Sequence, residues 1–216
     1  MPEAQEATRV AMKVELHLHT SRYSDCAVAS PRELMEALIG AGYEAVYITE
    51  HHFVWSDDEL AALQQEFPEI RIFPGVELNL CFEPLQHLLV LGTNDPQYLT
   101  IFNPGKVLAK AREEGHLTVL AHPCRWEGAW QILDDGLLPD AIEHHTGNQE
   151  FSQCAAAQAK AEEHHLPLVN AGDVHSLHMV GQFWIETARP LVEADDIRRI
   201  ILAGDYENRT PRSRMF

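Results

Sequence analysis

Nine side chains of the metal-binding types lie at or just beyond the ends of apolar, strand-like runs. The runs cover residues 14–19, 45–49, 70–80, 87–91, 117–121 and 166–170. In a chain that alternates such runs with helical patterns, strand ends gather at one rim of a barrel, where catalytic residues collect. Because imidazole and carboxylate groups suit several divalent metals, the sequence predicts one metal site. Its candidate ligands are His17, His19, Asp25, His51, Glu77, His87, His122, Asp173 and His175.

The spacing of these residues suggests how each one binds. His17 and His19 are two apart on a strand, so both side chains point to the same face and can share an ion. Glu77 follows Gly75, and a glutamate can bridge two ions with its two oxygens. Asp25 lies in a loop, where a carboxylate either binds metal or caps a turn. Half-buried strand histidines and a salt-bridged strand acid are the alternative readings of the same residues.

Six short motifs follow one another between roughly residues 12 and 181. They read His-x-His-Thr with Ser-Asp, Thr-(acid)-His, Gly-Val-Glu, His-Leu-Leu-Val-Leu-Gly, Ala-His-Pro and Gly-Asp-x-His. In this order they resemble the polymerase and histidinol phosphatase (PHP) metallohydrolases. The resemblance implies an α/β fold, a distorted (β/α)7 barrel of the PHP type.

The resemblance also implies a centre of three divalent ions, which are zinc, manganese or iron, since imidazole and carboxylate ligands suit all three. The carboxylates Glu77, Asp25 and Asp173 are then the candidate catalytic groups. In the implied arrangement, ion one takes His17, His19, Glu77 and Asp173, ion two takes Glu77, His87 and His122, and ion three takes Asp25, His51 and His175.

Four further charged residues flank the candidate ligands. The family commonly has aspartate where Glu50 stands, and we expect this acid to orient a ligand rather than bind metal. Glu143 matches a family acid after the strand-like run 141–142, and we expect a structural role for it. Arg22 and Arg125 lie beside ligand motifs, and each is either a bidentate phosphate ligand or a surface arginine.

Helical patterns separate the strand-like runs. Ser30 is a cap residue, Pro31 occupies the first helical position, and Glu33 places an acid in the first turn of a helix that Gly40 ends. Further helices are predicted over 57–67, 105–114, 151–165 and 195–202. The alternation predicts a parallel α/β fold with six or seven strands, although periodicity alone does not distinguish a barrel from an open sheet.

Length and composition set the remaining bounds. The chain has 216 residues, which suits a single domain over 12–216 after a loose lead-in over 1–11. A formal net charge of −17 disfavours nucleic-acid and anionic membrane partners. No stretch reaches the roughly 18 apolar residues of a membrane span, and no apolar leader is visible. The composition leaves the oligomeric state open.

The cysteines show neither a close pair nor Cys-x-x-Cys spacing. We expect free thiols in a reducing cytoplasm, and we expect Cys26 and Cys124, which stand beside candidate ligands, to pack rather than bind metal. The four residues are Cys26, Cys81, Cys124 and Cys154.

The chemistry that such a centre supports is metal-assisted hydrolysis of a phosphate ester. No Ser-His-Asp or Cys-His arrangement and no Gly-rich phosphate loop competes with it. Because only 34 residues separate His87 from His122, we expect no large lid, which favours a small phosphomonoester. A nuclease is the first alternative, weakly supported by six arginines over 189–214. A non-catalytic metal-binding module, which loss of ligands would signal, is the second.

Overall fold

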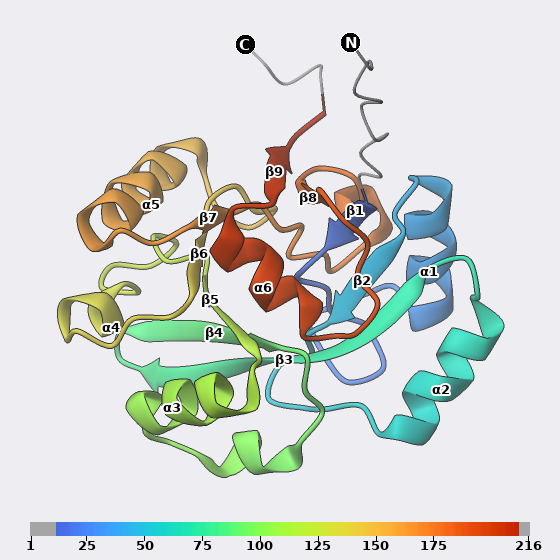
Figure 1. Ribbon diagram of the computed structural model, residues 1–216, viewed down its shortest axis with the longest axis horizontal. Coiled ribbons are helices and arrows are strands. Elements are labelled where there is room, and N and C mark those ends of the chain that lie inside the picture. The colour runs from blue at the N-terminus through green and yellow to red at the C-terminus, as the bar shows by residue number, and fades with distance from the viewer. Residues whose placement is uncertain (1–11, 212–216) are drawn as a thin grey trace, which may run out of the picture.

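The computed structural model describes residues 12–211. The predicted lead-in over 1–11 lies outside the described residues, and the division into a lead-in and one domain stays a prediction. Nine strands form one sheet in the order β7-β6-β5-β4-β3-β2-β1-β8-β9 (Figure 1). Their bounds are β1 (Met12–Glu15), β2 (Ala45–Ile48), β3 (Arg71–Phe82), β4 (Leu85–Leu91), β5 (Leu117–Ala121), β6 (Ala141–Glu143), β7 (Leu168–Val169), β8 (Trp184–Thr187) and β9 (Tyr206–Arg209).

The helices form where the sequence supplies caps. Ser30 and Ser56 each build a capping box, with Glu33 and Glu59 respectively at the third helical position. Gly204 ends the last helix in the left-handed region, at φ 71°. The helices are α1 (Pro31–Gly40), α2 (Asp57–Glu66), α3 (Pro104–Glu114), α4 (Gln131–Asp134), α5 (Phe151–His164) and α6 (Asp196–Ala203), with two 3₁₀ turns, η1 (Pro96–Thr100) and η2 (Leu177–Met179).

The sheet curls into a nearly closed barrel. Side chains of the edge strand β9 reach the backbone of the other edge strand, β7: Asn208 Oδ1 accepts the backbone N–H of Asn170, just after β7, at 2.6 Å, and the Tyr206 hydroxyl donates to the carbonyl of Leu168 at 2.8 Å. The sheet is parallel between β1, β2 and β3 and between β5, β6 and β7, whereas β4 and β8 run antiparallel to their neighbours. The predicted α/β class and distorted barrel are confirmed, but the predicted number of strands was too low.

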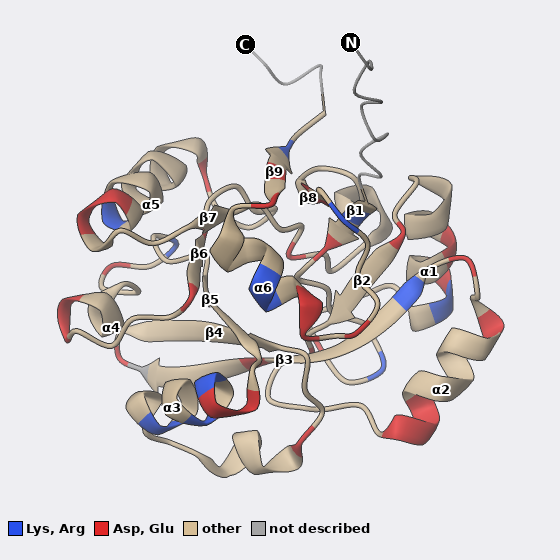
Figure 2. Cartoon of the chain, viewed as in Figure 1, with Lys and Arg blue, Asp and Glu red and all other residues tan. Residues whose placement is uncertain are grey.

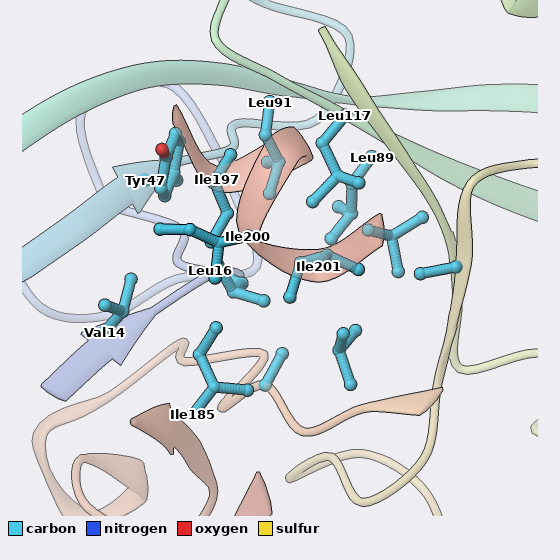
Figure 3. Packing of buried hydrophobic residues seen from close by; sticks show 14 of the residues in the cluster. Val14, Leu16, Tyr47, Leu89, Leu91, Leu117, Ile185, Ile197, Ile200 and Ile201 are labelled. Carbon is cyan, nitrogen blue, oxygen red and sulfur yellow. The ribbon is translucent and has the colours of Figure 1, made fainter. Parts of the chain in front are cut away.

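Helix α6 closes one end of the barrel. Its buried face carries Ile197, Ile200 and Ile201, which pack among apolar strand residues, as Figure 3 shows. Arg71, the first residue of β3, donates to the carbonyl of Val192 just before α6, and Arg198 on α6 pairs with Asp140, which precedes β6. Because α6 thus covers the amino ends of these parallel strands, their carboxyl ends are left for a site.

The described residues carry charge on many elements. Figure 2 shows Lys and Arg dispersed among several helices and strands, with Asp and Glu between them. Within 12–211, no helix combines the length and the apolar character that crossing a membrane requires.

Candidate metal centre

His17 and His19 lie just past the end of β1. Between them, Leu18 forms a parallel bridge with Val174, and the His19 amide donates to the Val174 carbonyl at 2.9 Å. This extended backbone places both rings on one side, as the spacing predicts. The two Nε2 atoms are 2.9 Å apart, and both side chains are fully buried.

Glu77, in the middle of β3, is the hub of the cluster. Its Oε1 lies 2.7 Å from His87 Nδ1 and 3.1 Å from His122 Nε2. Its Oε2 lies 2.8 Å from His51 Nδ1 and 3.2 Å from His19 Nε2. Strand pairing produces this convergence, because β4 lies between β3 and β5 and residue 51 bridges to residue 77.

Asp173 supplies a second buried carboxylate. Its Oδ1 lies 3.3 Å from His17 Nε2 and 3.4 Å from His175 Nδ1, while Asn148 donates to Oδ2 at 2.7 Å. Asp173 has a φ of 47° and His122 a φ of 29°. Positive φ is uncommon for residues other than glycine and, where the surrounding structure holds it, clusters at functional sites.

Eight of the nine predicted ligands come together in the described part of the chain. They form four sets, and within each set the ligand atoms lie within 4.8 Å of one another. The sets agree with the implied arrangement in part, since His17, His19 and Glu77 share one set and His51 and His175 share another. In the remaining two, His51 joins Glu77 and His87, and His122 joins His17 and Asp173. The four sets are His17, His19 and Glu77; His17, His122 and Asp173; His51, Glu77 and His87; and His19, His51 and His175.

The loop that follows His19 does not bring its carboxylate to these sets. Asp25 is exposed and belongs to none of the four groups, so its role as a ligand stays a prediction. Cys26 beside it is also exposed, contrary to our expectation, whereas Cys124 is buried as expected. Neither cysteine is in a ligand group.

The polar atoms of the cluster fit a cation better than they fit one another. Glu77 Oε2 lies close to imidazole nitrogens but makes no well-aligned hydrogen bond with them, and the buried His122 Nδ1 has no hydrogen-bond partner among the described residues; both are costly for groups removed from water. The Nδ1 of His17 faces Glu143, leaving its Nε2 lone pair directed at the Nε2 of His19. Divalent ions between the facing imidazole nitrogens and the carboxylate oxygens would satisfy Glu77 Oε2 and the Nε2 lone pairs of His17 and His19.

The carboxylates and two of the histidines have the protonation states that metal binding requires. Burial raises the pKa of Glu77 and of Asp173, but the neighbouring histidines, His17 first, hold both pKa values well below the usual range. Burial lowers the pKa of His87, and it lowers the pKa of His175 to about 4. Ionised carboxylates and neutral imidazoles are the forms that bind metal. For His17 and His19, burial lowers the pKa but the neighbouring carboxylates raise it above its ordinary value, so both rings release a proton when they bind metal.

Glu143 holds two of the ligands in place. Its Oε1 lies 2.7 Å from His17 Nδ1, and its Oε2 accepts the backbone N–H of His122 at 2.7 Å. The structure therefore gives this acid a positioning role, in line with the structural role expected for it. A carboxylate behind a histidine ligand fixes the ring and its tautomer.

Glu50 acts one step further from the centre. It accepts hydrogen bonds from Ser24 Oγ at 2.6 Å and from Trp55 Nε1 at 3.0 Å. The Ser24 hydroxyl in turn lies 3.3 Å from His19 Nδ1 and accepts the His51 amide at 3.2 Å. Glu50 thus orients the ligands through Ser24, and no metal group includes it.

The two arginines predicted to bind phosphate differ in their surroundings. Arg22 is committed to Glu59, with Nη2 2.6 Å from Oε1. Arg125 is exposed, with its guanidinium 4.6 Å from the centre of the Trp126 ring. Trp126 meets the rings of both His87 and His122 edge-on, so Arg125 stands beside the ligands.

Sequence reasoning missed several residues that support the centre. Glu15 is fully buried, and its Oε1 accepts the backbone N–H groups of His17 at 3.1 Å and Gly172 at 2.6 Å. It thereby joins the two ligand-bearing segments, and a Cβ at Gly172 would lie 2.6 Å from Glu15 Oε2. A lone acid within an apolar strand was the available signal for Glu15, whereas the sequence offered none for Asn148 or Trp126.

Models of known protein families match most of the chain. The model of the PHP domain matches residues 15–134, and the model described as PHP-associated matches residues 152–206. An uncharacterized protein of Methanocaldococcus jannaschii is 29% identical over 122 residues, which cover 52% of this chain and 68% of the relative.

Solved structures share the fold at low sequence identity. A two-domain protein from Bacteroides vulgatus, described as containing a predicted PHP-like metal-dependent phosphoesterase, superposes with a TM-score of 0.70 and 15% identity. The match covers 93% of this chain but only 65% of that protein. A lesion-specific endonuclease from Pyrococcus furiosus gives a TM-score of 0.63 at 14% identity, covering 92% of this chain and 58% of that one.

Proposed function

The chain belongs to the PHP domain family, and we propose that it hydrolyses a small phosphomonoester at a centre that holds three divalent ions. The observation that carries the proposal is the convergence of six histidines on the carboxylates of Glu77 and Asp173. Zinc, manganese and iron all suit this donor set. Ions bound there would lower the pKa of a water molecule and neutralise the charge of a phosphoryl group.

The reaction exchanges one P–O bond for another. The bond between phosphorus and the ester oxygen breaks, its electron pair leaves with that oxygen, and a bond from water oxygen to phosphorus forms. The departing alkoxide takes up a proton and becomes the alcohol, while the attacking water gives up a proton. His51 and His175 have side chains 32% and 18% exposed, whereas His17 and His19 are fully buried. The substrate therefore reaches the centre from the side of His51 and His175.

The chain's own residues fix the geometry. Glu143 and Ser24 hold imidazole rings, and Asn148 holds the Asp173 carboxylate. Such hydrogen bonds preorganise groups that must not move during reaction. Arg125 is our proposed phosphate ligand, because it stands beside Trp126 at the centre, while the guanidinium of Arg22 is engaged by Glu59.

A small ester fits the charge of this protein better than nucleic acid does. Binding to a phosphate backbone depends on extensive Lys and Arg contacts, and the chain has 16 such residues against 33 acids. A nuclease is the second candidate, favoured by the shared fold of the Pyrococcus furiosus endonuclease. The density of ligands argues against a purely structural module.

The test is a metal assay followed by a substrate screen. We expect close to three ions per chain after metal resupply, and turnover on a panel of small phosphomonoesters that exceeds cleavage of a single-stranded oligonucleotide. Fewer than one ion per chain would contradict the centre. Oligonucleotide cleavage that is faster than hydrolysis of every monoester, and that survives added salt, would replace the phosphatase by a nuclease.

A further inference from the structure

Three exposed apolar side chains stand on segments that carry metal ligands and a fourth begins α5, and we propose that these four side chains select a phosphomonoester whose alcohol is apolar. This inference rests on the proposed function and names the substrate class of the same site. The four residues, here called the apolar rim, are Val28, Phe53, Phe151 and Leu177, which are 78%, 37%, 79% and 46% exposed.

Three of the rim residues follow a ligand along the chain. Phe53 comes two residues after His51, and Leu177 comes two residues after His175. Val28 lies on the loop after His19, and its amide donates to the carbonyl of His175 at 2.9 Å. This bond draws the Val28 and Leu177 segments together.

Ring contacts tie the aromatic members to the same end of the barrel. Phe53 stacks on Tyr23, with ring centres 3.8 Å apart and planes at 22°, and Tyr23 directly precedes Ser24 on the His19 loop. Phe151, at the start of α5, packs against His145 with ring centres 5.5 Å apart. The carbonyl of His145 accepts the Ala171 amide, two residues before Asp173.

The position of the rim matters because scattered exposed apolar residues are ordinary, whereas apolar residues on segments that carry or adjoin the ligands can contact the substrate. Trp126, edge-on to His87 and His122, adds apolar surface directly beside the ligands. In the described part of the chain, the other exposed large apolar side chains are Phe102, Leu138, Val192 and Leu202.

The rim and the centre together fit an amphiphilic ester. The ligand cluster and Arg125 attract a phosphoryl group, which must lie at the centre to react. The rim side chains, by contrast, have no donors or acceptors for the hydroxyl groups of a sugar, and they gain free energy by covering hydrocarbon. An aryl-substituted or branched alkyl alcohol meets both demands.

The test compares esters of alcohols that share a primary alkyl oxygen, so that leaving-group reactivity stays nearly constant. They are 3-phenylpropyl phosphate, propyl phosphate, glycerol 3-phosphate and a nucleoside 5′-monophosphate. Partial burial of the phenyl group should raise kcat/KM for the first about tenfold over the second. A ratio near one, or faster hydrolysis of the sugar-bearing esters, would overturn the proposal.

Binding of phosphonates supplies a readout that needs no turnover. Titration calorimetry of the metal-loaded protein should show 3-phenylpropylphosphonate binding about tenfold more tightly than propylphosphonate. If this binding preference is observed but no ester is hydrolysed, the role of the apolar rim is supported and the proposed reaction is contradicted. Equal binding of the two phosphonates, together with hydrolysis of the esters, would contradict the proposed role of the apolar rim but not the proposed reaction.

Matched variants locate the effect. Leu177→Ser on the rim should reduce both the kcat/KM ratio of the two esters and the affinity ratio of the two phosphonates severalfold, and Phe151→Ser should do the same. The control is Leu202→Ser, because Leu202 is 49% exposed against 46% for Leu177 but lies on α6 at the opposite end of the barrel. Rim variants that keep the wild-type ratios, with circular dichroism unchanged, would contradict the assignment.

Discussion

Glu143 and His17 meet at 2.7 Å through Oε1 and Nδ1, and this single contact decides which nitrogen of His17 faces the centre. With Nδ1 donating to the carboxylate, Nε2 keeps a free lone pair. The other oxygen of Glu143 accepts the His122 amide, so one acid sets two ligands. Its effect on metal binding should therefore exceed that of an ordinary buried hydrogen bond.

Replacing Glu143 should weaken metal binding while leaving the ligands in the chain. For Glu143→Ala we expect a loss of about 10- to 100-fold in metal affinity, measured by competition with a chromophoric chelator. Glu143→Gln keeps an acceptor for one partner and should fall between wild type and alanine. An unchanged metal affinity in the alanine variant would show that the contact does not position His17.

The double variant His17→Ala with His19→Ala should abolish hydrolysis with the fold largely retained. Both rings point into the ligand cluster rather than the apolar core, so their removal costs ligands more than packing. Steady-state turnover below about a tenth of wild type is expected, since ligand loss usually costs far more than that. Circular dichroism and the metal content measured together separate loss of the centre from unfolding.

Asp25 is the one predicted ligand that the structure does not bring to the cluster, and a substitution tests its role. Because its side chain is exposed and outside the four groups, we expect Asp25→Asn to lower turnover less than His87→Asn does. The bound-metal count should fall by at most one ion per chain. A loss as large as that of the histidine variant would mean that Asp25 closes on the centre when metal or substrate binds.

Most of the clustered residues were predictable because they lie at or just beyond the ends of apolar runs, and barrels collect strand ends at one rim; Glu77 instead lies in the middle of β3. Which ligand atoms approach one another was not predictable from the sequence, because it depends on strand register. The bridge between His51 and Glu77 places His51 against the hub instead of beside Asp25. The spacing of residues along the sequence does not predict such pairings between strands.

The strands that the sequence did not predict have a similar explanation. In β9, Tyr206 is half-buried and the other three residues are exposed, so the apolar alternation that marks a strand is absent. β9 forms because it pairs with β8 and because Asn208 and Tyr206 reach the far edge of the sheet. These are tertiary contacts, which override a weak local preference.

The last prediction concerns acid stability and Glu59, which ties the Arg22 loop to α2. Hydrogen bonds from Tyr23 and Ser56 and the pairing with Arg22 lower the pKa of Glu59 to about 2 from an ordinary value of 4.5. A carboxyl group with a depressed pKa stabilises the fold fully above its unfolded pKa, and this contribution is lost as pH falls through its folded pKa. Wild type should therefore exceed Glu59→Gln in free energy of unfolding at pH 6, and the difference should shrink steadily between about pH 4.5 and 2.

Urea denaturation of both proteins across this range measures the difference, in which effects common to both, such as protonation of the histidines, cancel. Ser56→Ala removes one of the hydrogen bonds to Glu59 and should diminish the pH-dependent part without abolishing it. A difference that stays constant from pH 6 to pH 2.5 would show that the Glu59 carboxylate gains nothing from Tyr23, Ser56 and Arg22. The loop that carries Arg22 and Asp25 would then be held by its other contacts, such as the hydrogen bond from Ser24 to Glu50.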